Sequence, residues 1–429
     1  KNIYPKMNFE ADDDTSEIES GEFIEKVLQL SENDLSIKID NVYCEPGSRQ
    51  GDNYMSLIKR ATVQGKRRDL DYQRKLIVKR QISSISRRQL FRCDEAFANE
   101  IAAYTKVLPH LRQFSGNRLP YPKCLFAGFD DAEKEVIIFE DLRESGFEME
   151  DRLKGLDYNH CSLVMKELGN LHAISLAIKA TEPATFEIMR RSISEIVYCP
   201  EAREFISNTL ECSLRDTLTS LRASNSDGHL TNAIVKTERM QGNMYDIMSG
   251  HVLDNDESWR VICHGDIWIN NLMFRRRKST VEQVKLVDLQ TMRCTSLVID
   301  ILHFIYTSTV RDFRQTHLHQ LIIDYREALI KSLHIYLQAE DILQSLQMQF
   351  SVERIKEELH RKMLYGLGNA MWLMPAVTFH PNRIPDLNSV TITDFGNNTQ
   401  MTQMLIPEYH KRIREMLLEF QEEGILQNL

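Results

Sequence analysis

The sequence lacks any long uninterrupted run of apolar residues. A helix that crosses a bilayer needs about 20 such residues in a row, and no stretch of this chain approaches that length. The opening residues also lack the short apolar core that a secretory signal peptide carries. We therefore expect no membrane span and no secretion, and we place the protein in the cytoplasm.

The cysteines are few and scattered. There are 8 of them, and none stands in the short Cys-x-x-Cys spacing that is typical of zinc and redox sites. A disulfide framework would also be unusual in a reducing cytoplasm. The sequence therefore predicts free thiols rather than a metal or redox centre built from cysteine.

An excess of basic residues is absent as well. The net charge is −9 at pH 7, which argues against nonspecific binding to the nucleic-acid backbone. The hydrophobic content of 42% and the charged content of 27% are those of a soluble globular protein. Because 429 residues exceed what one small core organises, we expect two lobes of unequal size and a monomer.

The most informative stretch that is present reads Val261-Ile-Cys-His-Gly-Asp-Ile-Trp-Ile-Asn-Asn271, followed by Val284-Lys-Leu-Val-Asp-Leu-Gln290. Glycine permits a sharp backbone turn, so Asp266 projects from a loop rather than from a strand face. Transfer of a phosphoryl group to a hydroxyl requires a carboxylate near the attacking oxygen and oxygen ligands for metal ions. We interpret Asp266 as the catalytic base, and Asn271 and Asp288 as magnesium ligands.

A simpler interpretation of this stretch is a turn followed by a strand-end cap. His-Gly-Asp alone is common by chance, but the triplet followed by Asn271, and by Asp288 after an apolar strand, is far more restrictive. The sequence also contains Asp394-Phe-Gly396, which reproduces the metal-binding triplet of protein kinases. That triplet lies among prolines and asparagines with a weak strand signal before it, so we interpret it as a coincidence.

A phosphate-binding site also needs a cation upstream, and Lys79 is the candidate. Lys75-Leu-Ile-Val-Lys-Arg80 reads as a strand that follows a hairpin turn at residues 64–68. Apolar residues at helical spacing in the predicted helix 87–108 put Glu100 on or beside its buried face, where an unpaired carboxylate is costly. We predict a Lys79–Glu100 ion pair. Glu95 is the alternative partner, and an ordinary solvated lysine is the simpler alternative for Lys79.

Two further segments complete the predicted nucleotide site. The stretch that begins at Gly47 lacks the Gly-x-Gly-x-x-Gly pattern, yet a shorter loop can still present backbone amides to phosphate. Its candidate contacts are Gly51, Asn53 and Ser56. An apolar strand at 135–139 then breaks into acidic residues, as a hinge beside a nucleotide base would, and the candidates there are Phe139, Glu140 and Leu142. A plain strand end is the alternative.

The rest of the chain reads as mainly helical. Asp300 stands inside a strongly apolar segment, where a charge needs partners, and we assign it a structural rather than a catalytic role. We interpret His172, in a predicted helix, as a core histidine that orients the catalytic loop. No Ala-Pro-Glu segment or long activation loop follows Asp288, which weakens a protein as the acceptor and favours a small alcohol.

At these residues the sequence resembles the ecdysteroid kinase-like family, within the group that includes choline kinases and aminoglycoside phosphotransferases. That family shows His-Gly-Asp-Leu-Trp-Val-Asn-Asn and Asp-Phe-Gln at the places of residues 264–271 and 288–290, where Leu289 is a conservative departure. It also shows Leu-Ile-Val-Lys and Phe-x-x-Glu-x-x-x-Tyr, which match Lys79 and Glu100. The resemblance covers about residues 40 to 380 and implies a protein kinase-like α+β fold. The fold has two lobes, a small N-terminal β-rich lobe and a large, mainly helical C-terminal lobe.

We therefore divide the chain into an acidic disordered tail (1–22), a nucleotide-clamping lobe (23–141) and a catalytic and substrate-binding lobe (142–429). The resemblance implies ATP- and magnesium-dependent phosphorylation of a small-molecule alcohol, an ecdysteroid or a xenobiotic. The alternatives are a choline or ethanolamine kinase, whose cationic substrate would need an aromatic or acidic cage, a nucleotide-binding pseudokinase, and a protein kinase.

Overall fold

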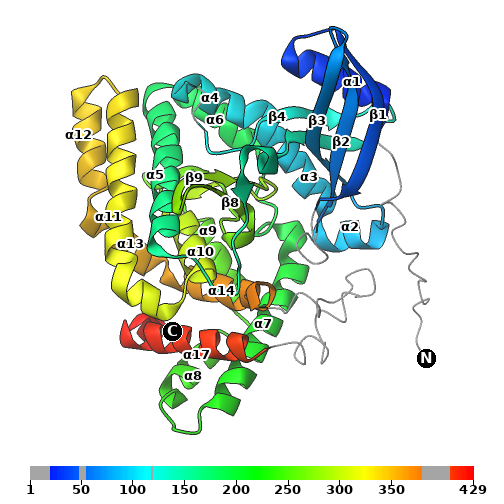
Figure 1. Cartoon of the computed structure of the whole chain (residues 1–429). Helices are drawn as coiled ribbons and strands as arrows, with labels where there is room; N and C mark the ends of the chain where they lie inside the picture. The colour runs from blue at the N-terminus through cyan, green and yellow to red at the C-terminus, as the bar shows by residue number, and fades with distance from the viewer. Residues whose placement is uncertain (1–19, 48–54, 117–118, 379–405) are drawn as a thin grey trace, which may run out of the picture.

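The N-terminal part of the protein is built on one antiparallel sheet (Figure 1). The computed structural model describes residues 20–47, 55–116, 119–378 and 406–429. The sheet has five strands in the order β1-β2-β3-β5-β4. These strands are β1 (Ile37–Pro46), β2 (Leu57–Arg67), β3 (Leu70–Arg80), β4 (Cys124–Phe129) and β5 (Glu135–Glu140).

The β2–β3 hairpin turns later in the chain than the sequence analysis predicts. The turn lies at Arg68 and Asp69, whose φ angles are 48° and 63°, and two such residues in succession are what a tight hairpin turn requires. Gly65 instead lies inside β2, opposite the irregularity in β1 between Ile39 and Asn41. A side chain at Gly65 would collide with the backbone of β1, so this glycine serves strand pairing and not the turn.

Helices flank this sheet. Helix α1 (Gly21–Glu32) packs on one face, and it begins inside the predicted tail, whose residues 1–19 lie outside the described part of the chain. The predicted helix 87–108 is a succession of segments, because Arg92 adopts a left-handed conformation with φ 51°. The segments are α2 (Ile85–Phe91), α3 (Cys93–Ala102), the π-helix η1 (Ala103–Val107) and α4 (Leu108–Ser115).

The C-terminal part is mainly helical, with two small sheets, β10-β7 and β6-β8-β9. Its strands are β6 (Phe147–Glu148), β7 (Arg260–Cys263), β8 (Leu272–Arg277), β9 (Thr280–Leu286) and β10 (Arg293–Ser296). Its longer helices are α5 (Tyr158–Thr181), α6 (Pro183–Ser192), α7 (Arg203–Ser224), α8 (Thr231–Glu238), α9 (Met244–Val252), α10 (Val298–Ser308), α11 (Arg311–Tyr336), α12 (Glu340–Gln349), α13 (Val352–Arg361), α14 (Met363–Thr378) and α17 (Pro407–Glu422). Short 3₁₀ turns are η2 (Leu142–Ser145), η3 (Pro200–Ala202), η4 (Ile269–Asn271) and η7 (Ile425–Asn428).

The alternation of side chains along the sheet decides where a site can form. In β5, Val136 and Ile138 join the small core under α1, whereas Ile137 and Phe139 join the large core that continues into the C-terminal part. Successive side chains of a strand point to opposite faces. Lys79 pairs with Ile137 in the register of β3 and β5 and so lies on the face toward the C-terminal part.

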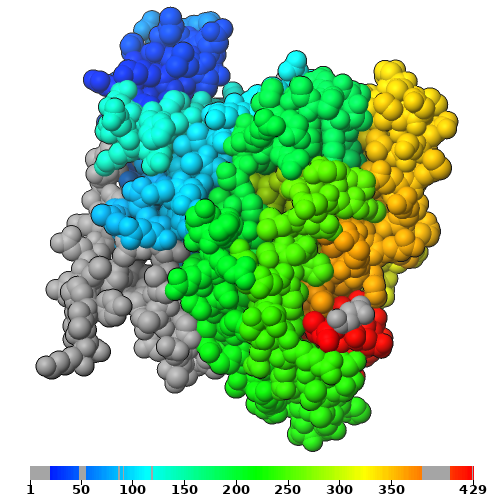
Figure 2. All heavy atoms as spheres, turned by 180° about the vertical axis from the view of Figure 1, so that it is seen from behind, coloured from blue at the N-terminus to red at the C-terminus, as the bar shows by residue number. Residues whose placement is uncertain are grey.

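The two parts form unequal lobes, and the predicted α+β fold class is confirmed. The sheet and α1 lie at one end, and α7 and α8 reach the opposite end of the molecule (Figures 1 and 2). All 8 cysteines are free thiols, as predicted. Among the described residues, no helix is both long and apolar enough to span a membrane.

Helices α5 and α11 approach closely at Gly169, and this contact supports a stability test. A Cβ at Gly169 would lie 2.5 Å from the Tyr325 carbonyl oxygen. We therefore expect Gly169→Ala to lower the free energy of unfolding by about 1–3 kcal/mol through overpacking. Chemical denaturation measures this change.

The matched control is the same substitution at Gly250 in α9, where a Cβ would meet no atom within 4 Å. Gly250→Ala should raise the free energy of unfolding by about 0.4–1 kcal/mol, because alanine restricts the unfolded chain. Equal effects of the two substitutions would contradict the close helix contact.

Candidate active site

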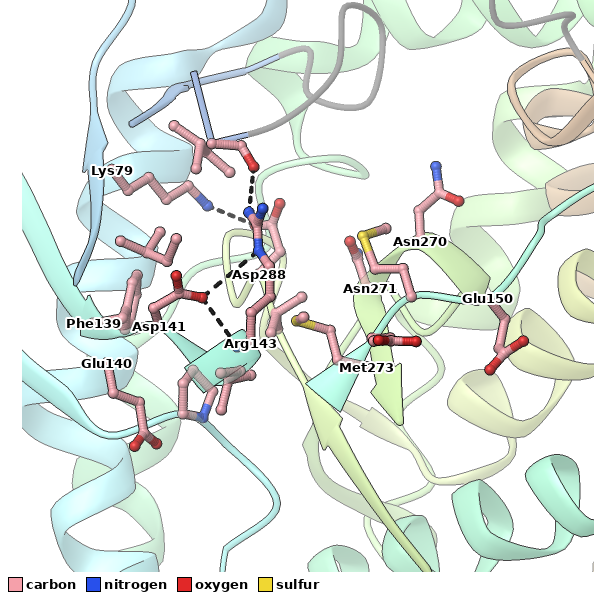
Figure 3. A pocket seen from close by; sticks show the side chains of 18 of the residues that line it. Lys79, Phe139, Glu140, Asp141, Arg143, Glu150, Asn270, Asn271, Met273 and Asp288 are labelled. Carbon is pink, nitrogen blue, oxygen red and sulfur yellow. Dashed lines mark hydrogen bonds and ion pairs between the residues drawn. The ribbon is translucent and has the colours of Figure 1, made fainter. Parts of the chain in front are cut away.

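A cavity of about 810 Å³ opens between the two lobes (Figure 3). The N-terminal sheet and α3 supply one wall, including Ile77, Lys79 and Glu100, and the end of β9 with the loop before β8 supplies the other. Of the site residues that the sequence analysis names, the cavity is lined by Lys79, Glu100, Phe139, Glu140, Leu142, Asn271 and Asp288.

The predicted Lys79–Glu100 ion pair is present. Lys79 Nζ lies 2.6 Å from Glu100 Oε2 and 3.1 Å from Asp288 Oδ1. Lys79 and Glu100 are both buried. The alternative partner, Glu95, instead pairs with Arg92 on the surface. Glu100 Oε1 also accepts a hydrogen bond from the Leu289 amide, so the carboxylate touches the backbone immediately after Asp288.

This cluster keeps the lysine charged. Burial lowers the pKa of the Lys79 ammonium, but the Asp288 and Glu100 carboxylates outweigh burial and raise that pKa above its ordinary value. Asp288 itself has φ 68°, a left-handed conformation that is uncommon for residues other than glycine. Strained backbone of this kind is concentrated at functional sites.

The loop between β7 and β8 places Asp266 beside Asn271. Asn271 Nδ2 donates to the Asp266 carbonyl oxygen at 2.9 Å and to Asp266 Oδ2 at 2.7 Å. Burial would raise the pKa of Asp266, but contacts with His303, His264 and Asn271 outweigh it and lower that pKa. The Asp266 side chain is 30% exposed. Asp266 is not one of the described residues that line the cavity, and Asn271, to which it is bonded, connects it to the cavity wall.

The donor set on the C-terminal wall fits a magnesium ion. The Asn271 amide nitrogen is used inside the loop, which leaves its Oδ1 as an oxygen donor. The Val287 amide donates to the Asn271 carbonyl oxygen, so the end of β9 and the loop are tied together. Asn271 and the Asp288 carboxylate line the same cavity, and Mg²⁺ prefers few hard oxygen ligands of this kind.

Asp300 braces the loop that carries Asp266, in the structural role that the sequence predicts for it. Its oxygens accept hydrogen bonds from the amides of His264 (2.8 Å) and Gly265 (2.9 Å). His172 Nε2 lies 3.3 Å from the same carboxylate, and His172 Nδ1 contacts the Tyr325 hydroxyl. Burial raises the pKa of Asp300, but His172, His264 and the Gly265 amide outweigh it and lower that pKa.

Gly265 is required by this arrangement. Its φ is 88°, and a Cβ there would collide with the carbonyl of Thr291. The buried cluster of His172, Cys263 and Asp300 also carries ligating atoms within 4.8 Å of one another. Because backbone amides already occupy the Asp300 oxygens, we interpret that cluster as part of the brace rather than as a metal site.

The expected base pocket is apolar. Phe139 and Leu142 line the cavity, and the Phe139 ring packs edge-on against Tyr104 with centroids 5.0 Å apart. The Glu140 side chain is different, because its Oε1 accepts from the Lys123 amide at 2.7 Å and it points away from Asp288 (Figure 3). Glu140 therefore caps the neighbouring strand.

Ser56 is the one glycine-loop candidate that lies within the described residues. Gly51 and Asn53 lie outside the described residues, as does the Asp394 triplet. Ser56 is buried and is not one of the described residues that line the cavity.

Sequence reasoning missed two features of the site. Arg143 lines the cavity and donates to the Gly47 carbonyl oxygen at 2.7 Å, and no motif marks it. His303 lies against Asp266. Its position one helical turn after Asp300 on the same predicted segment is a signal that could have found it.

The brace generates a stability prediction. In Asp300→Asn, an amide NH₂ would face one of the two backbone amides, leaving a buried donor unsatisfied. We expect the free energy of unfolding to fall by about 1–3 kcal/mol, measured by chemical denaturation. Asp312→Asn removes the same charge at an exposed position in α11 and should change stability by less than about 0.5 kcal/mol. Indistinguishable results would contradict the brace.

Comparisons with solved structures yield distant matches. A variant of aminoglycoside 2'-phosphotransferase-IIIa in its GDP complex is 9% identical, with 96% of this chain and 100% of that chain covered and a TM-score of 0.43. A choline/ethanolamine kinase family protein from Mesorhizobium loti is 13% identical, with 87% and 92% covered and a TM-score of 0.37. A microcompartment-associated aminopropanol kinase is 12% identical, with 94% and 98% covered and a TM-score of 0.39. Values this low do not bear on function.

The comparison with protein families, unlike that with solved structures, decides the family of this chain. No curated protein matches the chain, but the model of the ecdysteroid kinase-like family matches residues 50–337. That range is more than half of the chain, and it includes the Lys79–Glu100 pair, the loop at Asp266, and Asp288 just after β9. The resemblance carried by those motifs is thereby confirmed, and the chain belongs to the ecdysteroid kinase-like family.

Proposed function

We propose that this protein transfers the γ-phosphoryl group of ATP to the hydroxyl of a small molecule, with magnesium. One observation carries the proposal. A buried ammonium held between two carboxylates, Lys79 with Glu100 and Asp288, faces the same cavity as Asn271, which is bonded to Asp266. Membership of a kinase-like family supports the same reaction.

The charge at the site supports a divalent cation. Acidic residues outnumber basic ones on the cavity wall, so the site is anionic before nucleotide enters. The basic residues are Lys79, Arg143 and Arg152, and the acidic ones are Glu100, Glu140, Asp141, Glu148, Glu150, Asp151 and Asp288. A triphosphate would be repelled unless a cation accompanied it. Magnesium-ATP, when bound, supplies the γ-phosphoryl group and the cation that neutralises its charge.

Each residue then has a role that follows from its position. Lys79, oriented by Glu100, holds the phosphates, and Asn271 and Asp288 would hold magnesium. Asp266 binds the acceptor hydroxyl at its exposed edge and accepts its proton. Because the pKa of Asp266 is lowered, the carboxylate is ionised and ready to accept at neutral pH.

The acceptor that we propose is an ecdysteroid or another apolar alcohol, such as a xenobiotic, in keeping with the family. A cationic amino alcohol such as choline is the second candidate, because the acidic residues Glu148, Glu150 and Asp151 also line the cavity. We further propose a cytoplasmic monomer with a lobe boundary at residues 141 and 142.

The catalytic assignment predicts the behaviour of Asp266→Asn. Loss of the base should lower turnover by about 10²–10⁴-fold, while magnesium-ATP affinity changes little. The measurement is mass spectrometry of phosphorylated products from ecdysteroids, choline and plant phenolic alcohols. Unchanged turnover in the variant would refute the role of Asp266, and absence of any product from the wild-type protein would favour a pseudokinase.

Lys79 generates a binding prediction. Lys79→Met removes the cation and leaves two carboxylates facing the phosphates. The dissociation constant of magnesium-ATP should therefore rise at least about tenfold, which corresponds to a loss of about 1.4 kcal/mol in binding free energy. Calorimetric titration measures it. Lys75→Met is the matched control, since Lys75 lies on the same strand and pairs with Glu144 near the surface. Equal loss in both variants would contradict a specific role for Lys79.

A further inference from the structure

Helix α10 carries a second polar residue at the catalytic loop. Every residue of α10 is buried, and His303 is only 4% exposed. Asp300 and His303 lie one turn apart and therefore share a face of the helix. Buried polar residues on so apolar a helix require an explanation, and the bonds of Asp300 to the loop explain only one of them.

The two residues contact three consecutive positions of the loop. Asp300 accepts from the amides of His264 and Gly265. His303 Nε2 lies 3.3 Å from Oδ1 of the next residue, Asp266. One turn of α10 thus holds the backbone of the loop with its first polar residue and faces the carboxylate of the base with its second.

The Asp266 carboxylate is approached differently at its two oxygens. Oδ2 accepts from Asn271 Nδ2 at 2.7 Å, whereas Oδ1 faces His303. The side chain is 30% exposed, and the proposed function places the acceptor hydroxyl at that exposed edge. Rotation of the carboxylate would exchange the two oxygens and disturb the Asn271 contact, so a second donor at Oδ1 would fix its orientation.

His303 is not a satisfied core histidine. Neither ring nitrogen forms a hydrogen bond of good geometry to any described residue, although both are buried. Buried polar atoms in proteins are nearly always hydrogen-bonded, and an exception calls for a functional explanation. Hydrogen bonds at active sites are often long without substrate and shorten when it binds.

We propose that His303 is a positioning residue for the phosphoryl transfer. Its Nε2–H donates to Asp266 Oδ1, fixes the orientation of the carboxylate and keeps the exposed edge directed at the acceptor hydroxyl. No proton needs to leave His303 in this role. The inference rests on the proposed function, because it assigns His303 a task in that reaction.

Three substitutions separate positioning from packing. His303→Leu should lower kcat about tenfold or more, with the KM for magnesium-ATP within about twofold, because α10 does not line the nucleotide cavity. His303→Gln should recover most of the rate, since its amide nitrogen reaches the place of Nε2. His303→Asn should not, because its amide nitrogen takes the place of Nδ1.

Tyr306→Phe is the control on the same helix. The Tyr306 ring packs against Phe420 and lies 4.8 Å from the Arg314 guanidinium. Neither of these partners belongs to the loop that carries Asp266, so the Tyr306→Phe substitution should leave kcat unchanged. The inference is overturned if His303→Leu matches the wild-type rate, or if His303→Gln is no better than His303→Leu.

A spectroscopic measurement needs no acceptor. In protein with ¹⁵N-labelled histidine, the His303 resonances, assigned by their loss in His303→Gln, should show the tautomer protonated at Nε2. Asp266→Asn should shift the Nε2 resonance, and Tyr306→Phe should not. A tautomer protonated at Nδ1, or an Nε2 signal that ignores Asp266→Asn, would overturn the contact.

The two proposals fail in different ways. If the wild-type protein binds magnesium-ATP but phosphorylates no alcohol in the screen, the proposed function fails and the role of His303 fails with it. If the wild-type protein is active and the His303 variants behave like Tyr306→Phe, the proposed function stands and only the role of His303 fails.

Discussion

The ion cluster at Lys79 is the interaction on which the rest of the structure depends. It joins strand β3 and helix α3 of the N-terminal sheet region to Asp288, which lies two residues after the end of β9 and about 200 residues later in the sequence. Separating the lobes would break the contact between Lys79 and Asp288, and would remove the hydrogen bond from the Leu289 amide to the buried Glu100 carboxylate. Losing the partner of a buried charge is more costly than losing a surface ion pair. The cluster therefore sets the distance between the lobes and the shape of the cavity between them.

A second constraint acts on the other wall. The loop that carries Asp266 has little regular structure of its own. Asp300 holds it from α10 at two amides, and Asn271 of the same loop donates to the Asp266 carboxylate. In our proposal, His303 orients the remaining oxygen of that carboxylate. Preorganised polar groups are what a phosphoryl-transfer site contributes, since there is little covalent chemistry for the protein to perform.

Much of this arrangement could be predicted from the sequence, for identifiable reasons. Lys79 and Glu100 are charges at positions where the apolar pattern demands burial, so their pairing follows from the cost of leaving either alone. Asp266, Asn271 and Asp288 stand in a motif whose spacing is restrictive. The turn at Arg68 and the break at Arg92 could not be foreseen, because both depend on non-glycine residues in left-handed conformations. Glu140 lines the cavity as predicted, but a strand end does not reveal that its side chain will cap the neighbouring strand.

The acceptor is the least predictable part, since the residues that shape its pocket follow no motif. The central claim, transfer of a phosphoryl group to an alcohol, is tested most directly with ATP labelled at the γ-phosphate and a panel of hydroxylated small molecules, with magnesium or with a chelator. The account predicts that the label appears in an alcohol phosphate only when magnesium is present. Label that stays in ATP, or that is released only as inorganic phosphate with every alcohol, would contradict it.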